Sequence, residues 1–177
     1  SSRCMTAPGL ETRPMPSGGW LLAGAALCGG RAYALLADFF AQTARMMGMD
    51  TNAPYAAMEG LLKSADRPED VPTVLPLFEG TRQDSTQTGS ITGLTAENFT
   101  PLHLIYGMMD GMAHELHQMY QAYRAAGGTA KKLIGSGGGL RNNRFLCESF
   151  SRVFDSAIIL SDGREEAACG AALYAAD

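Results

Sequence analysis

The chain has 177 residues, of which 46% are hydrophobic and 18% charged, and this is an ordinary globular composition. Its 14 Lys and Arg stand against 18 Asp and Glu, which gives a net charge of −4 without any run of basic residues. The apolar content excludes intrinsic disorder, and we expect no nucleic-acid partner.

The first half of the chain predicts two helices and several short extended segments. Residues 1–18 are rich in Pro and Gly and predict an extended loop. Residues 19–27 predict a short buried strand, and this apolar stretch is far shorter than the ~20 residues of a membrane-spanning helix. We therefore expect no membrane partner. Helices are predicted over 29–47, with Leu36, Phe39, Phe40 and Met47 on the apolar face, and over 54–63.

The strongest helix signal covers residues 101–126. Thr100 is a suitable N-cap, Pro101 suits the first turn, and Gly127 and Gly128 suit the C-terminal end. The preceding residues predict extended segments at 71–78 and 90–94 with a polar loop at 79–89. A methionine-rich stripe runs along the long helix, and it predicts core packing, with a partner-binding groove as the alternative.

The last third of the chain predicts strands that alternate with helices. Strands are predicted over 131–136 and 157–160, and helices over 142–154 and 164–176, with Gly170 placed for close approach of a neighbouring segment. This alternation predicts an α/β fold with helices packed on a mixed sheet, and we expect residues 1–177 to form a single domain.

No cluster of metal ligands stands out in the sequence. The four cysteines, Cys4, Cys28, Cys147 and Cys169, are far apart and form no CxxC pair, which predicts buried, reduced thiols in a cytoplasmic protein. His114 and His117 lie one turn apart without a third ligand nearby, so we expect solvated surface residues and no metal site.

Three glycines, Gly137 to Gly139, separate a predicted strand from a helix. Such a turn lets a ligand contact the backbone, although a tight structural turn is the equally simple alternative. The segment matches neither the Walker A pattern nor the dinucleotide-binding pattern. Gly29 and Gly30 open another helix after a strand, and we expect both junctions to face one cleft.

Four segments together resemble the C-terminal part of the FGGY family of carbohydrate kinases. The middle segment is most similar to sedoheptulokinase-like members. The resemblance covers nearly the whole chain and rests on LLAGAALCGGRAYALL (21–36), LPLFEGTRQDSTQTGSITGLTAENFT (75–100), LIGSGGGLRNNRFL (133–146) and REEAACGAALYAA (164–176).

This resemblance implies two actin-like (ribonuclease H-like) ATPase domains around a cleft, of which the chain would be the C-terminal, nucleotide-side domain without its first strands. It implies ATP and Mg²⁺ as cofactors, and a sugar held through the N-terminal domain of a longer protein. Gly137 and Gly138 would line the adenosine pocket, Asn142 would contact the adenine, and Gly30 would lie near the nucleotide. Ala34 stands where glycerol kinases carry a Gln.

The resemblance also implies that the catalytic aspartate, the phosphate loop and most metal ligands precede Ser1. We therefore expect no catalytic residue and no sugar kinase activity in residues 1–177 alone. Glu165 is expected to be structural, while Arg82 and Asp84 are either structural or adjacent to the substrate. The unpaired sheet edge of such a domain favours a homodimer. The alternative function is a non-catalytic actin-like module for nucleotide binding or assembly.

Overall fold

The computed structural model describes residues 4–15, 18–49, 52–163 and 165–175. They belong to two compact units, one ending at Thr129 and the other beginning at Ala130, and each unit is described by itself. The expectation of a single domain over residues 1–177 stays a prediction.

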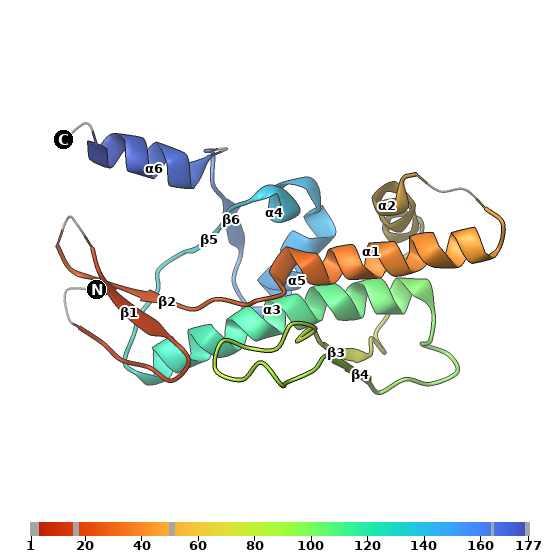
Figure 1. The fold of residues 1–177 in the computed structure, drawn as a ribbon, viewed down its shortest axis with the longest axis horizontal. Coiled ribbons are helices and arrows are strands. Elements are labelled where there is room, and N and C mark those ends of the chain that lie inside the picture. The colour runs from red at the N-terminus through yellow and green to blue at the C-terminus, as the bar shows by residue number, and fades with distance from the viewer. Residues whose placement is uncertain (1–3, 16–17, 50–51, 164, 176–177) are drawn as a thin grey trace. The chain divides into compact units, whose positions relative to one another are not determined.

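Three helices form the core of the first unit: α1 (Gly29–Met46), α2 (Pro54–Ser64) and α3 (Pro101–Ala125). Each contacts the other two, and α1 runs alongside α3 (Figure 1). Thr100 caps α3 by accepting a hydrogen bond from the backbone N–H of His103, and Pro101 occupies the first turn, as expected. The middle of α3, from Leu104 to Ala113, is buried without interruption, so Met108, Met109 and Met112 of the methionine-rich stripe are core. Met119, further along the stripe, is half-buried.

Two antiparallel strand pairs complete the first unit. β1 (Glu11–Pro14) pairs with β2 (Trp20–Ala23), and β3 (Thr73–Leu75) pairs with β4 (Ser90–Thr92). β3 packs on α3 where two glycines leave the helix surface bare. A Cβ on Gly107 would lie 2.8 Å from the carbonyl oxygen of Pro72, and one on Gly111 would lie 2.3 Å from that of Val74.

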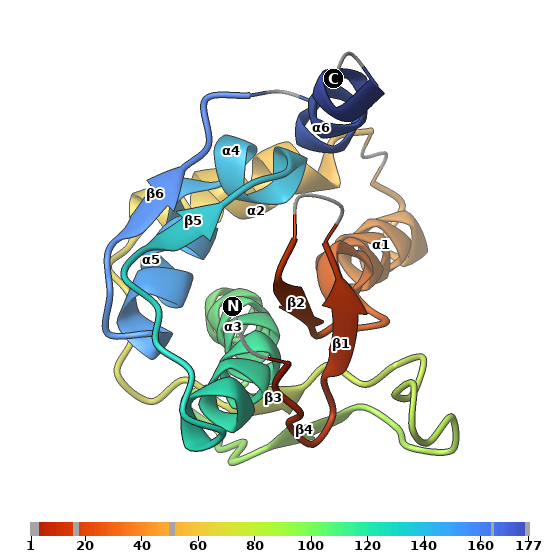
Figure 2. The ribbon, with the colours of Figure 1, turned by 90° about the vertical axis from the view of Figure 1, so that its left-hand side faces the viewer.

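The second unit is a strand–helix–strand arrangement with a helix after it. Its elements are β5 (Leu133–Gly135), α4 (Gly138–Asn142), α5 (Arg144–Val153), β6 (Ile158–Leu160) and α6 (Glu166–Ala175). β5 and β6 are parallel, and the two arrows lie side by side in Figure 2. A parallel pair needs a crossover, which α4 and α5 supply.

The predicted helices and the α/β class are confirmed, but the single mixed sheet is not. The described strands form three separate two-stranded sheets. The expected N-terminal loop contains β1, because Gly18 and Gly19, both with positive φ, close a hairpin that the Pro-rich composition hides. β2 is half-exposed and ends at Ala23, well short of the predicted strand end.

Several predicted details of the helices are wrong. Phe39 and Met47 of the predicted apolar face are exposed, because α1 packs through small residues, Ala32, Ala37 and Ala41, that allow a closer approach. The helix expected from residue 142 begins already at Gly138 and is interrupted at Asn143, whose side chain caps α5.

Helix α6 is confirmed only in its position. Its expected ends, Arg164 and Ala176, lie outside the described residues. α6 has no buried residue, and among the described residues of its unit nothing would lie within 4 Å of a Cβ on Gly170, so the expected close approach is not seen there.

The expected burial of all four cysteines is also wrong. Cys28 is buried and Cys147 half-buried, whereas Cys4 and Cys169 are exposed, and all four thiols are free. Cys4 lies near the start of the chain and Cys169 on the exposed α6, where the apolar sequence neighbours find no core to join.

Candidate functional site

The glycine turn of the second unit is exposed. Gly137 has φ 93° and ψ 158°, a conformation that requires glycine, and it is the residue before the first turn of α4. A Cβ on Gly137 would meet nothing within 4 Å, and one on Gly138 would meet only Nδ2 of Asn142, at 3.8 Å. The turn therefore presents bare backbone beside an exposed amide side chain.

The two consecutive asparagines after the turn differ in role. Asn143 is structural, because its Oδ1 accepts a hydrogen bond of 3.1 Å from the backbone N–H of Leu146 at the start of α5. Asn142 is exposed at the end of α4, beside the glycine turn. The geometry thus assigns the capping role to Asn143 and leaves Asn142 as the ligand-contacting candidate.

The strand beneath the turn is fixed by close packing. Gly135 is buried, and a Cβ there would lie 3.0 Å from Leu140 and 3.1 Å from Ile158. The backbone N–H of Ser161 donates to the carbonyl oxygen of Gly135 at 2.9 Å. These contacts hold the last residue of β5, and hence the start of the turn, against β6.

An ion pair that the sequence did not reveal connects α4 to α6. Arg141 Nη2 donates to Oε1 of Glu166. The backbone N–H of Glu166 itself, with the Ser161 hydroxyl and the Arg141 guanidinium, holds the pKa of the Glu166 carboxyl below its ordinary value. Glu165, expected to be structural from the family pattern, is exposed, and the structural carboxylate is its neighbour.

Gly30 lies in the first unit, as the second residue of α1. It is exposed, and a Cβ there would meet nothing within 4 Å. Residues 24–28 separate β2 from α1, so this strand-to-helix junction is longer than expected. Cys28 precedes the helix without a side-chain cap, and burial raises the pKa of its thiol. That Gly30 shares a cleft with Gly137, Gly138 and Asn142 stays a prediction, because these three belong to the second unit.

The loop that contains Arg82 and Asp84 is held by its own polar contacts. The Asp84 carboxylate accepts hydrogen bonds from the Thr86 backbone N–H at 2.9 Å and the Thr86 hydroxyl at 2.6 Å, which keeps the pKa of Asp84 below its ordinary value. Arg82 donates to Oε1 of Glu11 at 3.0 Å across to β1. Both side chains thus have partners within the chain, and their structural or substrate-adjacent role stays a prediction.

Glu115 on α3 is a half-buried carboxylate for which the sequence predicted no role. It lines a pocket of about 280 Å³ with Thr81, Arg82 and Gln118, and no described residue forms a hydrogen bond with its buried Oε2. Burial raises the pKa of Glu115 above 4.5. The only signal for Glu115 in the sequence is an acidic residue beside the apolar stripe of α3.

Replacing Glu115 by Gln should stabilise the protein at neutral pH and leave it nearly unchanged in acid. Because the pKa of Glu115 is raised in the folded state, protonated Glu115 contributes stability that is fully present below the pKa of the unfolded state. This stability is lost as the pH rises through the folded-state pKa. Glutamine carries no charge, so the variant should gain a few tenths to about 1 kcal/mol at neutral pH, given partial exposure. Thermal unfolding at acidic and neutral pH tests this. An equal Tm difference at both pH values would contradict it.

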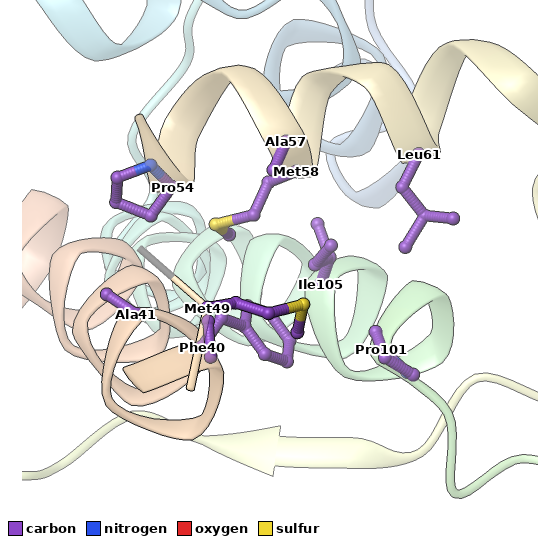
Figure 3. Close-up of a pocket in the computed structure, with 10 residues that line it drawn as sticks. Phe40, Ala41, Met49, Pro54, Ala57, Met58, Leu61, Pro101 and Ile105 are labelled. Carbon is purple, nitrogen blue, oxygen red and sulfur yellow. The ribbon is translucent and has the colours of Figure 1, made fainter. Parts of the chain in front are cut away.

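An apolar pocket of about 330 Å³ lies between α1, α2 and the first turns of α3 (Figure 3). Met58 and Ile105 contribute to its lining from α2 and α3, and Phe40 does so from α1. The lining carries no polar side chain, so this pocket is unsuited to the phosphates of a nucleotide.

The described ranges of the chain contain no group of three His, Cys, Asp or Glu side chains that could share a metal ion. Within the same ranges, no helix is both long and apolar enough to cross a bilayer.

Comparison with known proteins identifies the family. Residues 5–176 match the model described as the FGGY family of carbohydrate kinases, C-terminal domain. The chain is also 28% identical over 93 residues to the xylulose kinase of Bacillus subtilis, a match that covers 52% of this chain and 18% of that protein.

Solved kinases have the same fold. The Plasmodium falciparum glycerol kinase with ADP is similar with a TM-score of 0.73 and 18% identity, over 97% of this chain and 34% of that one. The xylulose kinase of Rhodospirillum rubrum is similar with a TM-score of 0.72 and 22% identity, over 90% of this chain and 31% of that one. The chain therefore spans about a third of the length of these kinases.

The predicted actin-like α/β fold is confirmed by these similarities, while the closer likeness to sedoheptulokinase-like members stays a prediction. Since the family model covers almost every residue, the chain belongs to the FGGY family of carbohydrate kinases, as a C-terminal domain of that family.

Proposed function

We propose that the chain is the nucleotide-side part of an ATP-dependent carbohydrate kinase, which transfers the γ-phosphate of ATP to a hydroxyl group of a sugar or polyol. The observation that carries the proposal is the open glycine turn beside Asn142, in a chain that belongs to a kinase family. Gly137 and Gly138 would admit the adenosine to the backbone, and the Asn142 amide would hydrogen-bond to the adenine. Gly30 would lie near the nucleotide at the start of α1.

The remaining chemistry is assigned to parts of the protein outside residues 1–177. Phosphoryl transfer requires a base, an oriented hydroxyl and neutralisation of the γ-phosphate charge. The described residues offer no acidic cluster fit to hold a free metal ion, so we place the ligands of the Mg²⁺ that accompanies ATP elsewhere. The sugar would bind through the N-terminal domain, and the ATP requirement fits a cytoplasmic protein.

Titration of ATP into the purified chain, followed by calorimetry, tests the proposed nucleotide site. Asn142→Ala should weaken binding by about 1–2 kcal/mol, the value of one polar contact in a partly buried site. Gly138→Val should abolish binding, because its branched side chain would occupy the space of the base. The fold should tolerate this change, since a Cβ on Gly138 is in contact with only one side-chain atom.

Gly170→Ala is the control, because it adds a methyl group at another open helical glycine of the same unit. Its ATP affinity should equal that of the natural sequence. Circular dichroism checks that each variant is folded. Unchanged ATP affinity in both Gly138→Val and Asn142→Ala would move the nucleotide site elsewhere, and sugar-dependent ATP turnover by residues 1–177 alone would refute the assignment of the catalytic groups.

A further inference from the structure

The short helix α4, which carries Asn142, is weakly anchored by its own residues. None of its five residues is buried, and two of them are glycines, which are poor helix formers. A helix this short does not sustain itself, because its few hydrogen bonds do not offset the cost of forming the first turn. The position of the Asn142 amide beside the glycine turn therefore depends on contacts between α4 and the rest of its unit.

Two residues of the same unit, Ser161 and Glu166, hold the glycine turn and α4 from both ends. Before the turn, the backbone N–H of Ser161 donates to the carbonyl oxygen of Gly135 at 2.9 Å. After the turn, Nη2 of Arg141 donates to Oε1 of Glu166. The Ser161 hydroxyl in turn donates to the Glu166 carboxylate, so both contacts belong to one polar network. We call Ser161, Glu166 and Arg141 the α4 clamp.

The ion pair of the α4 clamp is partly shielded from solvent. The side chains of Arg141 and Glu166 are 21% and 35% exposed, and the buried Nε of Arg141 donates to no residue that the structure describes. A partly desolvated guanidinium is unfavourable without its counter-charge. The pair therefore favours the one position of α4 in which the two side chains meet.

The other contacts at this end of α4 lead to α5. The carbonyl oxygen of Leu140 accepts a hydrogen bond from Cys147 Sγ at 3.0 Å, and the Asn143 side chain caps α5. The α4 clamp adds a tie to the start of α6, through the residue directly before Asn142.

We propose that Arg141 and Glu166 are positioning residues of the nucleotide site, whose ion pair holds the end of α4 so that the Asn142 amide stays beside the glycine turn. This inference rests on the proposed function, which gives Asn142 the contact with adenine. Arg141 and Glu166 act through Asn142 and not by contact with the nucleotide. When the pair is lost, the fraction of molecules with Asn142 in place falls, and the apparent ATP affinity falls by the same factor.

Calorimetric titration of ATP into the whole chain tests the role of the pair. Arg141→Gln and Glu166→Gln should each raise the dissociation constant by roughly three- to tenfold. The double variant should bind no more weakly than either single one, because each change alone already breaks the pair. Glu166→Gln is the decisive variant. Its loss of a negative charge would by itself strengthen the binding of anionic ATP, so weaker binding has to come from positioning.

Two further variants serve as controls. Lys131→Gln removes an exposed positive charge from the same unit, as Arg141→Gln removes a half-buried one, and it should leave the dissociation constant nearly unchanged. Arg141→Lys keeps the charge and should lose less affinity than Arg141→Gln.

Two readouts separate positioning from a general structural effect. In the Asn142→Ala background, Arg141→Gln should cause no further loss of ATP affinity, because it acts through Asn142. Hydrogen exchange without ATP should be faster at the amides of residues 139–142 in Arg141→Gln and Glu166→Gln, while the amides of α5 keep their protection.

Unchanged ATP affinity in Glu166→Gln, alongside weaker binding in Asn142→Ala, would overturn this inference and leave the nucleotide site in place. A further loss from Arg141→Gln in the Asn142→Ala background, or unchanged exchange of the α4 amides, would overturn it as well. A natural sequence that does not bind ATP would instead overturn the proposed function together with this inference.

Discussion

Replacing Asp110 by Ala should destabilise the first unit by about 3 kcal/mol. Asp110 Oδ2 accepts a hydrogen bond of 2.7 Å from Nη2 of Arg67, and the two side chains are only 12% and 30% exposed. The Arg67 guanidinium lies 5.0 Å from the centre of the Tyr106 ring, and its buried Nη1 forms no hydrogen bond with any residue that the structure describes. Removal of the carboxylate would therefore leave a largely desolvated cation without its counter-charge, which typically costs 3–5 kcal/mol. Partial exposure of Arg67 places the expected loss at the lower end.

Urea unfolding followed by tryptophan fluorescence measures this loss, since the chain has a single Trp, Trp20 of the first unit. The matched control replaces both partners, Arg67→Met with Asp110→Leu, and should recover most of the stability because no unpaired charge remains. A loss below about 1 kcal/mol for Asp110→Ala would show that the pair behaves as an exposed surface ion pair.

Helix α3 shows how far local signals determine this fold. Its N-cap, first-turn proline and terminal glycines all act within a few residues of the chain, so both ends could be read from the sequence. For α1 the ends were equally readable, but the buried face was not. The sequence pattern favours the large Phe39 and Met47, whereas the helix packs through its alanines. Which face is inward depends on how closely α3 approaches, and that distance is not encoded in α1 itself.

The strands were harder to predict because each is three or four residues long. So short a segment shows too little alternation to define a strand, and its pairing depends on partners far along the chain. β3, for instance, pairs with β4 across a loop of more than ten residues. The hairpin of β1 and β2 was missed since prolines in the segment argue for a loop.

The candidate site divides in the same way. The glycine turn and Asn142 could be found from sequence because strand, glycines and helix are adjacent in the chain, and the family resemblance gave them a role. The start of α4 at Gly138 could not be found from the sequence. Glycines are poor helix formers, so the helix was predicted to begin after them. Arg141 and Glu166 are 25 residues apart, and no local pattern reveals such a pair.

Gly107 and Gly111, four residues apart on α3, are a signal in the sequence for a long-range contact. Glycines at this spacing lie on one face of a helix and bare its backbone. The segment from Pro72 to Pro76 rests on this face, with Val74 buried.

Replacing Gly111 by Ala should therefore cost about 2–4 kcal/mol. The new Cβ would lie 2.3 Å from the Val74 carbonyl oxygen and 3.3 Å from Pro76 Cδ. Since the closest atom is backbone, β3 must move as a whole, and the loss exceeds the ~1 kcal/mol that alanine gains in a helix. Gly60→Ala is the control: Gly60 is exposed on α2 with nothing within 4 Å of its Cβ, and the change should stabilise by about 0.5–1 kcal/mol. Urea midpoints from Trp20 fluorescence compare the two variants, and a Gly111→Ala protein as stable as Gly60→Ala would mean that β3 does not rest on α3 as described.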